Sequence, residues 1–225
     1  MAVRVQPRQL AFALPHAESL SRDDFLEGSA NAEALGLVDG WPDWPNRVMV
    51  LVGPEGAGKS HLAAIWAEQA GARSTTVQSL TAATVPAALV TGAVVVEDLQ
   101  AGCFDERALF HLLNLAREDE AHVLITARIA PAAMEIDLRD LRSRLRALPV
   151  VHLKAPDDHL FRALIVKLCA DRQLSIDENV VNYVASRIER SFAAARRTVE
   201  LLDAEALRLG RPVTRALAAE LLRDS

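Results

Sequence analysis

The stretch Arg47-Val-Met-Val-Leu-Val-Gly53-Pro-Glu-Gly-Ala-Gly-Lys59-Ser60 determines the expected fold of this chain. Residues 47–52 read as an apolar strand of the kind found in parallel sheets that are covered on both faces. Residues 53–60 then satisfy the pattern G-x-x-x-x-G-K-[ST], and a helix is expected over residues 59–69. A strand, a glycine-rich loop and a helix in this order predict an α/β fold whose loop binds phosphate.

The residue types in this loop indicate a nucleotide as the ligand. Glycines let backbone N–H groups turn inward around phosphate oxygens, Lys59 is expected to reach the β- and γ-phosphates, and Ser60 is expected to bind Mg²⁺. ADP or ATP with Mg²⁺ is therefore the predicted cofactor, and the alternative is a strand, a turn and a helix with incidental glycines. The predicted nucleotide-binding residues of this segment are Gly53, Pro54, Glu55, Gly56, Ala57, Gly58, Lys59, Ser60 and His61.

Two further strands are expected to bring polar side chains to the same site. The apolar run at residues 93–96 ends in Glu97 and Asp98, which predicts a Walker B-like acid pair. Glu97 is expected to bind Mg²⁺ and Asp98 to orient water, and the alternative is an acidic strand end exposed to solvent. Thr126 ends the run at residues 121–126, which we expect to lie between the other two strands, and its hydroxyl is predicted to contact the γ-phosphate or water.

The remaining pattern divides the chain into two parts. Strands are expected at 74–77 and 150–153, and helices at 31–37, 105–117 and 138–145. No β pattern follows Pro156, and four helices are expected at 157–173, 177–189, 192–209 and 212–222. The sequence therefore predicts an α/β domain to about residue 155, followed by a small all-helical subdomain.

Composition narrows the class of protein. An apolar fraction of 51% over 225 residues excludes intrinsic disorder, and a formal net charge of −5 argues against a global electrostatic grip on nucleic acid. The two cysteines have no CxxC partner, which favours a reducing compartment. With no signal-peptide pattern at its start and no apolar run long enough to span a bilayer, the chain is expected to be cytoplasmic.

Several segments together resemble one family. They are Gly-Pro-Glu-Gly-Ala-Gly-Lys-Ser-His-Leu at 53–62, the acid-ended strand, Leu-Ile-Thr-Ala-Arg at 124–128 and Leu-Arg-Ser-Arg-Leu at 141–145. In this order, and followed by helices, they resemble the DnaA-related AAA+ family and its Hda-like regulators over residues 22–225. The resemblance implies an AAA+ nucleotide-binding domain at 22–155, with helices on both faces of its parallel sheet, and a helical lid at 156–225. It leaves no length for the DNA-binding domain of DnaA.

The first 21 residues carry a separate resemblance. Gln9-Leu10-Ala-Phe12-Ala-Leu14 is similar to the peptide by which Hda-like and other replication proteins bind the β sliding clamp. Leu10, Phe12 and Leu14 would enter an apolar cleft while Gln9 forms a hydrogen bond at its edge. The alternative is an edge strand or a tail that packs on its own domain.

The resemblance also implies a function and its residues. Arg144 matches the DnaA arginine finger, which would act in trans to promote hydrolysis of DnaA-bound ATP and so inhibit replication initiation. A solvated helix face is the alternative for Arg144 and its neighbours. The chain itself is expected to be an ATPase-activating partner more than a strong ATPase, with contact to DNA only through the clamp and DnaA.

Two departures from the family pattern bear on hydrolysis. The acid pair is Glu-Asp where the family has Asp-Asp, and the family's lid arginine falls near Ala193. Arg196 or Arg197, about one helical turn further along, are expected to replace that arginine. The sequence leaves open a homodimer and two other functions, a DNA-associated initiator or recruiter protein and a small P-loop kinase.

Overall fold

The computed structural model describes residues 20–223, and this part of the chain forms two compact units. The larger unit consists of Leu20–Phe161 with Arg190–Ala193. The smaller unit comprises, among the described residues, 162–189 and 194–223. The clamp-like peptide lies outside the described residues, so Gln9, Leu10, Phe12 and Leu14 remain a prediction.

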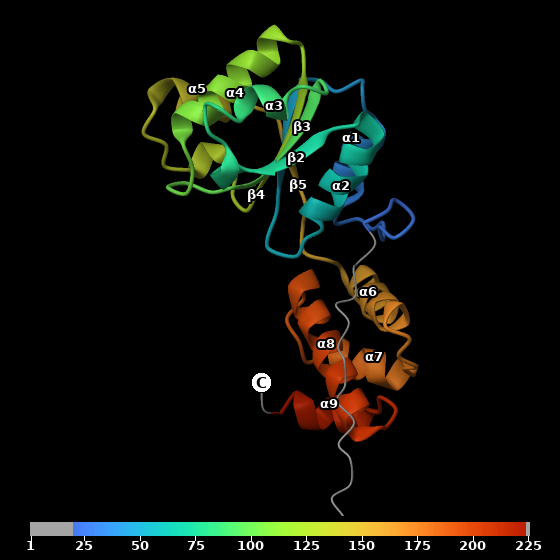
Figure 1. Ribbon diagram of the computed structural model, residues 1–225. Helices are drawn as coiled ribbons and strands as arrows, with labels where there is room; N and C mark the ends of the chain where they lie inside the picture. The colour runs from blue at the N-terminus through green and yellow to red at the C-terminus, as the bar shows by residue number, and fades with distance from the viewer. Residues whose placement is uncertain (1–19, 224–225) are drawn as a thin grey trace, which may run out of the picture. The chain divides into compact units, whose positions relative to one another are not determined.

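A five-stranded parallel sheet forms the centre of the larger unit, which confirms the predicted α/β fold (Figure 1). The strand order is β2-β3-β4-β1-β5. β4 therefore lies between β3 and β1, as expected, and Val50 of β1 pairs with Ile125 of β4. The bounds are β1 Val48–Val52, β2 Arg73–Thr76, β3 Ala93–Leu99, β4 His122–Ala127 and β5 Val150–His152.

Helices cover both faces of this sheet (Figure 1). On one face α1 (Ala32–Asp39) and α2 (Lys59–Ala70) pack in a core that includes Leu51 and Leu124. On the other face lie α3 (Val85–Ala88), α4 (Glu106–Glu118) and α5 (Arg139–Arg146). Their core includes Val50 and Ile125. Because successive side chains of a strand point to opposite faces, one apolar strand supplies both cores.

Several local features differ from the sequence expectation, among them the helix expected at 177–189, which ends at Ala185. The short helix α3 was not expected, and it follows from Pro86 near its start, since proline fits the first turn of a helix. β3 continues past the acid pair to Leu99, with a register irregularity between Val96 and Leu99 that keeps the strand paired. The last helix begins three residues later than expected, because the Thr214 hydroxyl accepts the Leu217 N–H as an N-cap.

The smaller unit is entirely helical (Figure 1). Its helices are α6 (Asp158–Asp171), α7 (Glu178–Ala185), α8 (Phe192–Leu209) and α9 (Arg215–Leu221). Arg172 after α6 forms an ion pair with Glu200 of α8 at 3.2 Å. The Tyr183 ring on α7 lies under the guanidinium of Arg215 at 5.4 Å from the ring centroid, which links α7 to α9.

No helix within residues 20–223 is long and apolar enough to cross a membrane.

The two cysteines should differ in reactivity. The pKa of the Cys169 thiol is raised to about 11, mainly by burial, with Arg172 opposing the shift and Asp203 adding to it, whereas Cys103 is exposed. At pH 8 we expect a disulfide-exchange reagent to modify one thiol rapidly in the native protein and two in guanidinium chloride. The variant Cys103→Ser should then show no rapid reaction until it unfolds. Rapid modification of both thiols in the native protein would contradict the burial of Cys169.

Candidate nucleotide-binding site

The glycine-rich loop lies between β1 and α2, at the carboxyl edge of the sheet. A Cβ atom on Gly53 would lie 2.8 Å from the Leu153 carbonyl oxygen, so only glycine fits there without a backbone shift. Gly58 has φ +93°, and a Cβ atom on it would lie 3.3 Å from the Phe25 ring. The loop is therefore held between the chain after β5 on one side and the segment before α1 on the other.

Lys59 is folded over this loop. Its side chain is 7% exposed, and Nζ donates hydrogen bonds to the carbonyl oxygens of Gly53 and Pro54, each at 2.8 Å. Burial is the main cause that lowers the Lys59 pKa, followed by the positive charge of Arg128, while Asp98 and Glu55 oppose the shift. A buried ammonium that is destabilised in this way fits an anionic ligand, because a phosphate in the loop would stabilise its charged form.

Ser60 and Glu97, both predicted to bind Mg²⁺, are in direct contact in the structure. The Ser60 hydroxyl donates to Glu97 Oε2 at 2.6 Å, across 37 positions of sequence. Residues 20–223 contain no cluster of three or more His, Cys, Asp or Glu side chains suited to a metal. A Mg²⁺ ion held by Ser60 and Glu97 would therefore take its other ligands from nucleotide phosphates and water, which is how Mg²⁺ commonly binds.

Thr126 contacts the acid pair through the backbone. Asp98 has a left-handed backbone conformation with φ 59°, and its N–H donates to the Thr126 hydroxyl oxygen at 3.1 Å. The Thr126 side chain is completely buried. Because no part of Thr126 is exposed, the structure shows no route from its hydroxyl to a ligand, and the expected contact with the γ-phosphate or water stays a prediction. Thr126 thus holds the turn that directs Asp98, a role the sequence did not reveal.

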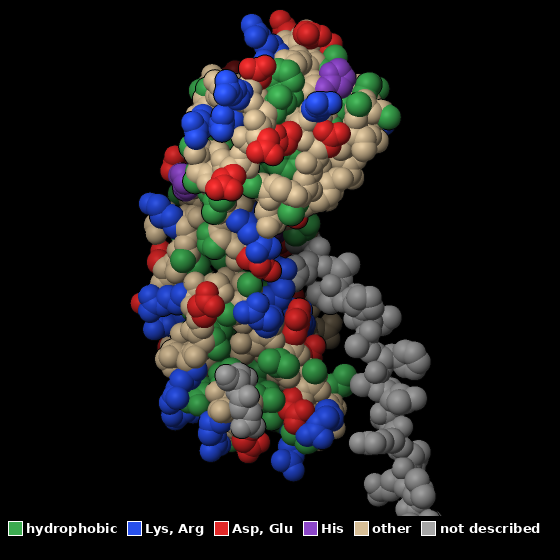
Figure 2. All heavy atoms as spheres, turned by 90° about the vertical axis from the view of Figure 1, so that its left-hand side faces the viewer, with side chains coloured by type: hydrophobic (Ala, Val, Ile, Leu, Met, Phe, Trp, Pro, Cys, Tyr) green, Lys and Arg blue, Asp and Glu red, His purple; other side chains and the backbone are tan. Residues whose placement is uncertain are grey.

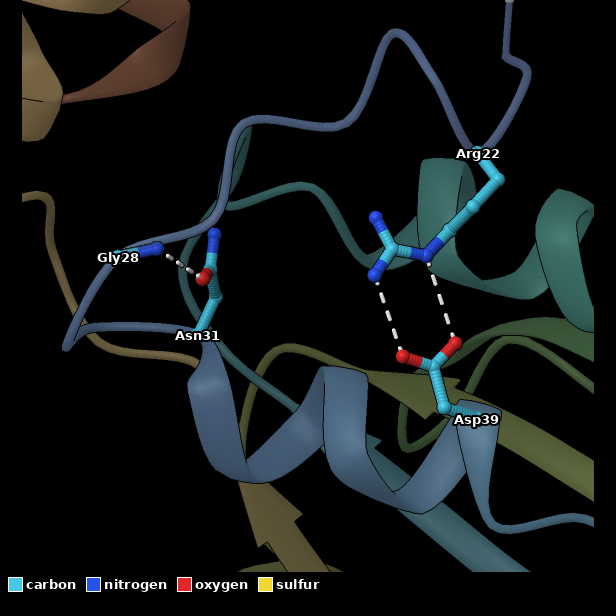
Figure 3. Close-up of polar contacts among 4 residues, drawn as sticks. All are labelled: Arg22, Gly28, Asn31 and Asp39. Atoms are coloured by element: carbon cyan, nitrogen blue, oxygen red, sulfur yellow. Dashed lines mark hydrogen bonds and ion pairs between the residues drawn. The ribbon is translucent and has the colours of Figure 1, made fainter.

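The segment that precedes α1 is attached to both α1 and the loop. Asn31 accepts the Gly28 N–H at 2.9 Å and donates to the Leu26 carbonyl oxygen at 2.8 Å, and Arg22 forms a forked contact with Asp39 (Figure 3). The two hydrogen bonds of the buried Asn31 side-chain amide fix the turn that leads into α1.

His61 has a clear structural role at this segment. Its Nε2–H donates to the Ser21 carbonyl oxygen at 2.8 Å, and its ring meets Phe25 edge to face with centroids 5.2 Å apart. His61 was predicted among the nucleotide-binding residues, and its contacts in the structure are to the segment before α1. Phe25 is thereby held beside Gly58 of the loop.

Arg128 is a functional candidate to which the sequence assigned no role. It follows β4, forms an ion pair with Glu55 of the loop at 2.8 Å, and lowers the Lys59 pKa through its charge. Its position two residues after Thr126 could have identified Arg128 from the sequence, because the carboxyl ends of adjacent parallel strands meet at one edge of the sheet.

Arg144 does not lie at the P-loop of its own chain. It lies near the end of α5, where one guanidinium nitrogen donates to the Asn114 side-chain oxygen and the group stacks over the Phe110 ring at 5.0 Å. Arg196 and Arg197 lie on α8, in the smaller unit, and their contact with a nucleotide stays a prediction.

The fold is similar to that of AAA+ domains in solved structures. Domain III of the replication initiation protein DnaA from Thermotoga maritima matches 94% of this chain and 98% of its own, with TM-score 0.74 and 19% identity. The RuvB R170A structure from Thermotoga maritima matches 91% of this chain and 72% of its own, with TM-score 0.70 and 16% identity.

A structure of AMPPCP-bound DnaA from Aquifex aeolicus matches 81% of this chain and 64% of its own, with TM-score 0.62 and 16% identity. No model of a known protein family matches the sequence. At these identities the likeness establishes the fold alone, which is a DnaA-related AAA+ fold.

Replacing Thr126 with valine should destabilise the site, because the Asp98 N–H would lose its acceptor. We expect the free energy of unfolding of Thr126→Val to fall by about 1–3 kcal/mol, as measured in urea, and that of Thr126→Ser to change less. Equal stability of the valine and serine variants would show that the hydroxyl contact contributes nothing.

Proposed function

We propose that this chain binds ADP or ATP with Mg²⁺ at the P-loop, through residues 53–60 with Glu97 and Asp98. The observation that carries this proposal is the Lys59 amine, buried and turned over the glycine-rich loop at the carboxyl edge of β1. The Ser60–Glu97 contact supports a metal beside the phosphates. A solved relative in fold, DnaA from Aquifex aeolicus, is described as bound to AMPPCP, which supports the same class of ligand.

We further propose that the chain is an Hda-like regulator of replication initiation that promotes hydrolysis of DnaA-bound ATP. The DnaA-like fold supports this proposal, and so does the position of Arg144, away from the P-loop of its own chain and with neutral partners. An arginine in that position is suited to stabilise transition-state charge on a nucleotide held by another chain. The clamp peptide at residues 9–14, in a tail of residues 1–21, would recruit the protein to DNA-loaded clamp.

The charge distribution favours indirect contact with DNA. On the face shown in Figure 2, Lys and Arg side chains are interspersed with Asp and Glu, in keeping with the formal net charge of −5. Direct binding to nucleic acid usually requires basic residues gathered on one surface. We therefore prefer the regulator over a DNA-associated initiator, with residues 22–155 as the nucleotide-binding domain and 156–225 as a lid.

The variant Lys59→Ala tests nucleotide binding. We expect its affinity for ADP, measured by calorimetry, to fall at least about tenfold, because a charge-assisted contact to phosphate is lost. Lys167→Ala, in the smaller unit, is the matched control and should bind normally.

The same measurement has a pH dependence with a defined sign. Phosphate favours the charged amine, so binding takes up a proton above the lowered Lys59 pKa. Affinity should be full below that pKa and decrease as the pH rises through it. Unchanged affinity in Lys59→Ala would refute the P-loop proposal.

Single-turnover hydrolysis of DnaA-bound ATP, with DNA-loaded clamp present, tests the regulator. We expect Arg144→Ala to remove the stimulation, since arginine fingers contribute ~10³–10⁵ in rate. Arg146→Ala, an exposed arginine on the same helix, should stimulate normally. The double variant Gln9→Ala/Leu10→Ala should lose stimulation only where it depends on clamp. Equal hydrolysis with and without the wild-type protein would rule out this function.

A further inference from the structure

The helix that carries Arg144, α5, is attached to α4 by polar contacts near both of its ends. Glu106, the first residue of α4, accepts the backbone N–H groups of Asp137 at 2.9 Å and of Leu138 at 2.6 Å, just before α5 begins. Near the other end of α5, a guanidinium nitrogen of Arg144 donates to Asn114 Oδ1 on α4. Both helices belong to the larger unit and lie on the same face of the sheet (Figure 1). The position of α5 is therefore fixed by α4.

These contacts come from a single stripe along α4. Glu106, Phe110 and Asn114 are spaced four residues apart, so they lie on one side of the helix. All three are half-buried, beside the core residues Leu109 and Leu113 of the same helix. A packed core with a polar stripe at its margin leaves α5 little freedom to shift along α4, and this holds Arg144 in a defined place.

The partners of Arg144 are both uncharged. Its guanidinium donates to the Asn114 side-chain oxygen and stacks over the Phe110 ring at 5.0 Å from the centroid, and it forms no ion pair with any residue in the described range 20–223. Other arginines of this range pair with a carboxylate, as Arg47 and Arg172 do. An arginine in an ion pair must break that pair before it can stabilise charge elsewhere. Arg144 is oriented without that cost.

We propose that Asn114 is a positioning residue for Arg144, which it orients through an uncharged acceptor so that the full positive charge can act on phosphate held by another chain. This inference rests on the proposed role of Arg144 in promoting hydrolysis of DnaA-bound ATP. Phe110 supports the guanidinium from the face of its ring, and Glu106 fixes the turn before α5. The neutrality of Asn114 is the essential feature, because a carboxylate in its place would accept the same hydrogen bond and cancel the charge.

The variants Asn114→Asp and Asn114→Ala separate this role from simple packing. In single-turnover hydrolysis of DnaA-bound ATP with DNA-loaded clamp, we expect Asn114→Asp to lower the stimulation at least about tenfold, since the introduced carboxylate pairs with Arg144. Asn114→Ala should lower it only about three- to fivefold, because the guanidinium keeps its charge and loses only its orientation. A purely structural contact predicts the reverse order, because aspartate retains the hydrogen bond and alanine removes it.

Arg107→Gln is the matched control on the same helix. It changes the net charge by the same amount as Asn114→Asp, and the Arg107 side chain is exposed. This variant should stimulate hydrolysis as the wild type does. An equal loss in Arg107→Gln and Asn114→Asp would overturn the proposal, and so would a greater loss in Asn114→Ala than in Asn114→Asp.

The orientation of Arg144 can also be measured on this chain alone. NMR of its guanidinium group, assigned by its absence in Arg144→Ala, should show slow rotation about the Nε–Cζ bond in the wild type and faster rotation in Asn114→Ala. Equal rotation in the two proteins would overturn the positioning role without any use of DnaA.

The outcomes distinguish this inference from the function on which it rests. If the wild type does not stimulate hydrolysis of DnaA-bound ATP, the regulator proposal fails, and the role of Asn114 fails with it. If the wild type stimulates and Asn114→Asp stimulates equally, the role of Asn114 alone is overturned.

Discussion

Burial of the parallel sheet on both faces is the constraint on which the larger unit depends. Alternate side chains of the inner strands β1, β3 and β4 enter one of two cores, so the faces of these strands have no room for polar chemistry. Polar groups are confined to the two edges where strands begin and end. The carboxyl edge has the P-loop, where Gly53 packs against the Leu153 carbonyl oxygen, and the amino edge has the ion pair of Arg47 with Glu120.

The sequence revealed the parts of the P-loop site that follow directly from a buried strand. Glu97 and Thr126 each stand at the end of an apolar run, and Ser60 follows the glycine-rich loop after a third run; parallel strands bring such positions to one edge. The strand order confirms that reasoning, because β4 lies between β3 and β1. Apolar runs together with the motif at residues 53–60 were therefore enough to predict the fold and to bring these residues to one edge.

Contacts between segments that are distant in the sequence could not be predicted from apolar runs and motifs. The bulge at Asp98 depends on how β3 pairs with β4, and the contact from His61 to Ser21 depends on where the segment before α1 turns back. The side-chain contacts of Arg144, on a helix, could not be predicted from the sequence for the same reason. Burial of Leu141 and Leu145 could be inferred from their spacing, whereas the Asn114 and Phe110 contacts of Arg144 require the packing of α5 on α4.

The two edges should act as electrostatically separate sites. They lie at opposite ends of β1, whose five residues span about 16 Å at ~3.3 Å per residue. The Debye length at physiological ionic strength is only ~8 Å, so charges exposed at one edge are largely screened from the other through solvent. The lowered pKa of Lys59 has local causes, which are burial and the nearby residues Arg128, Asp98 and Glu55. An anion bound at the P-loop should therefore leave the ion pair of Arg47 with Glu120 nearly unchanged, unless it shifts the packing of β1 itself.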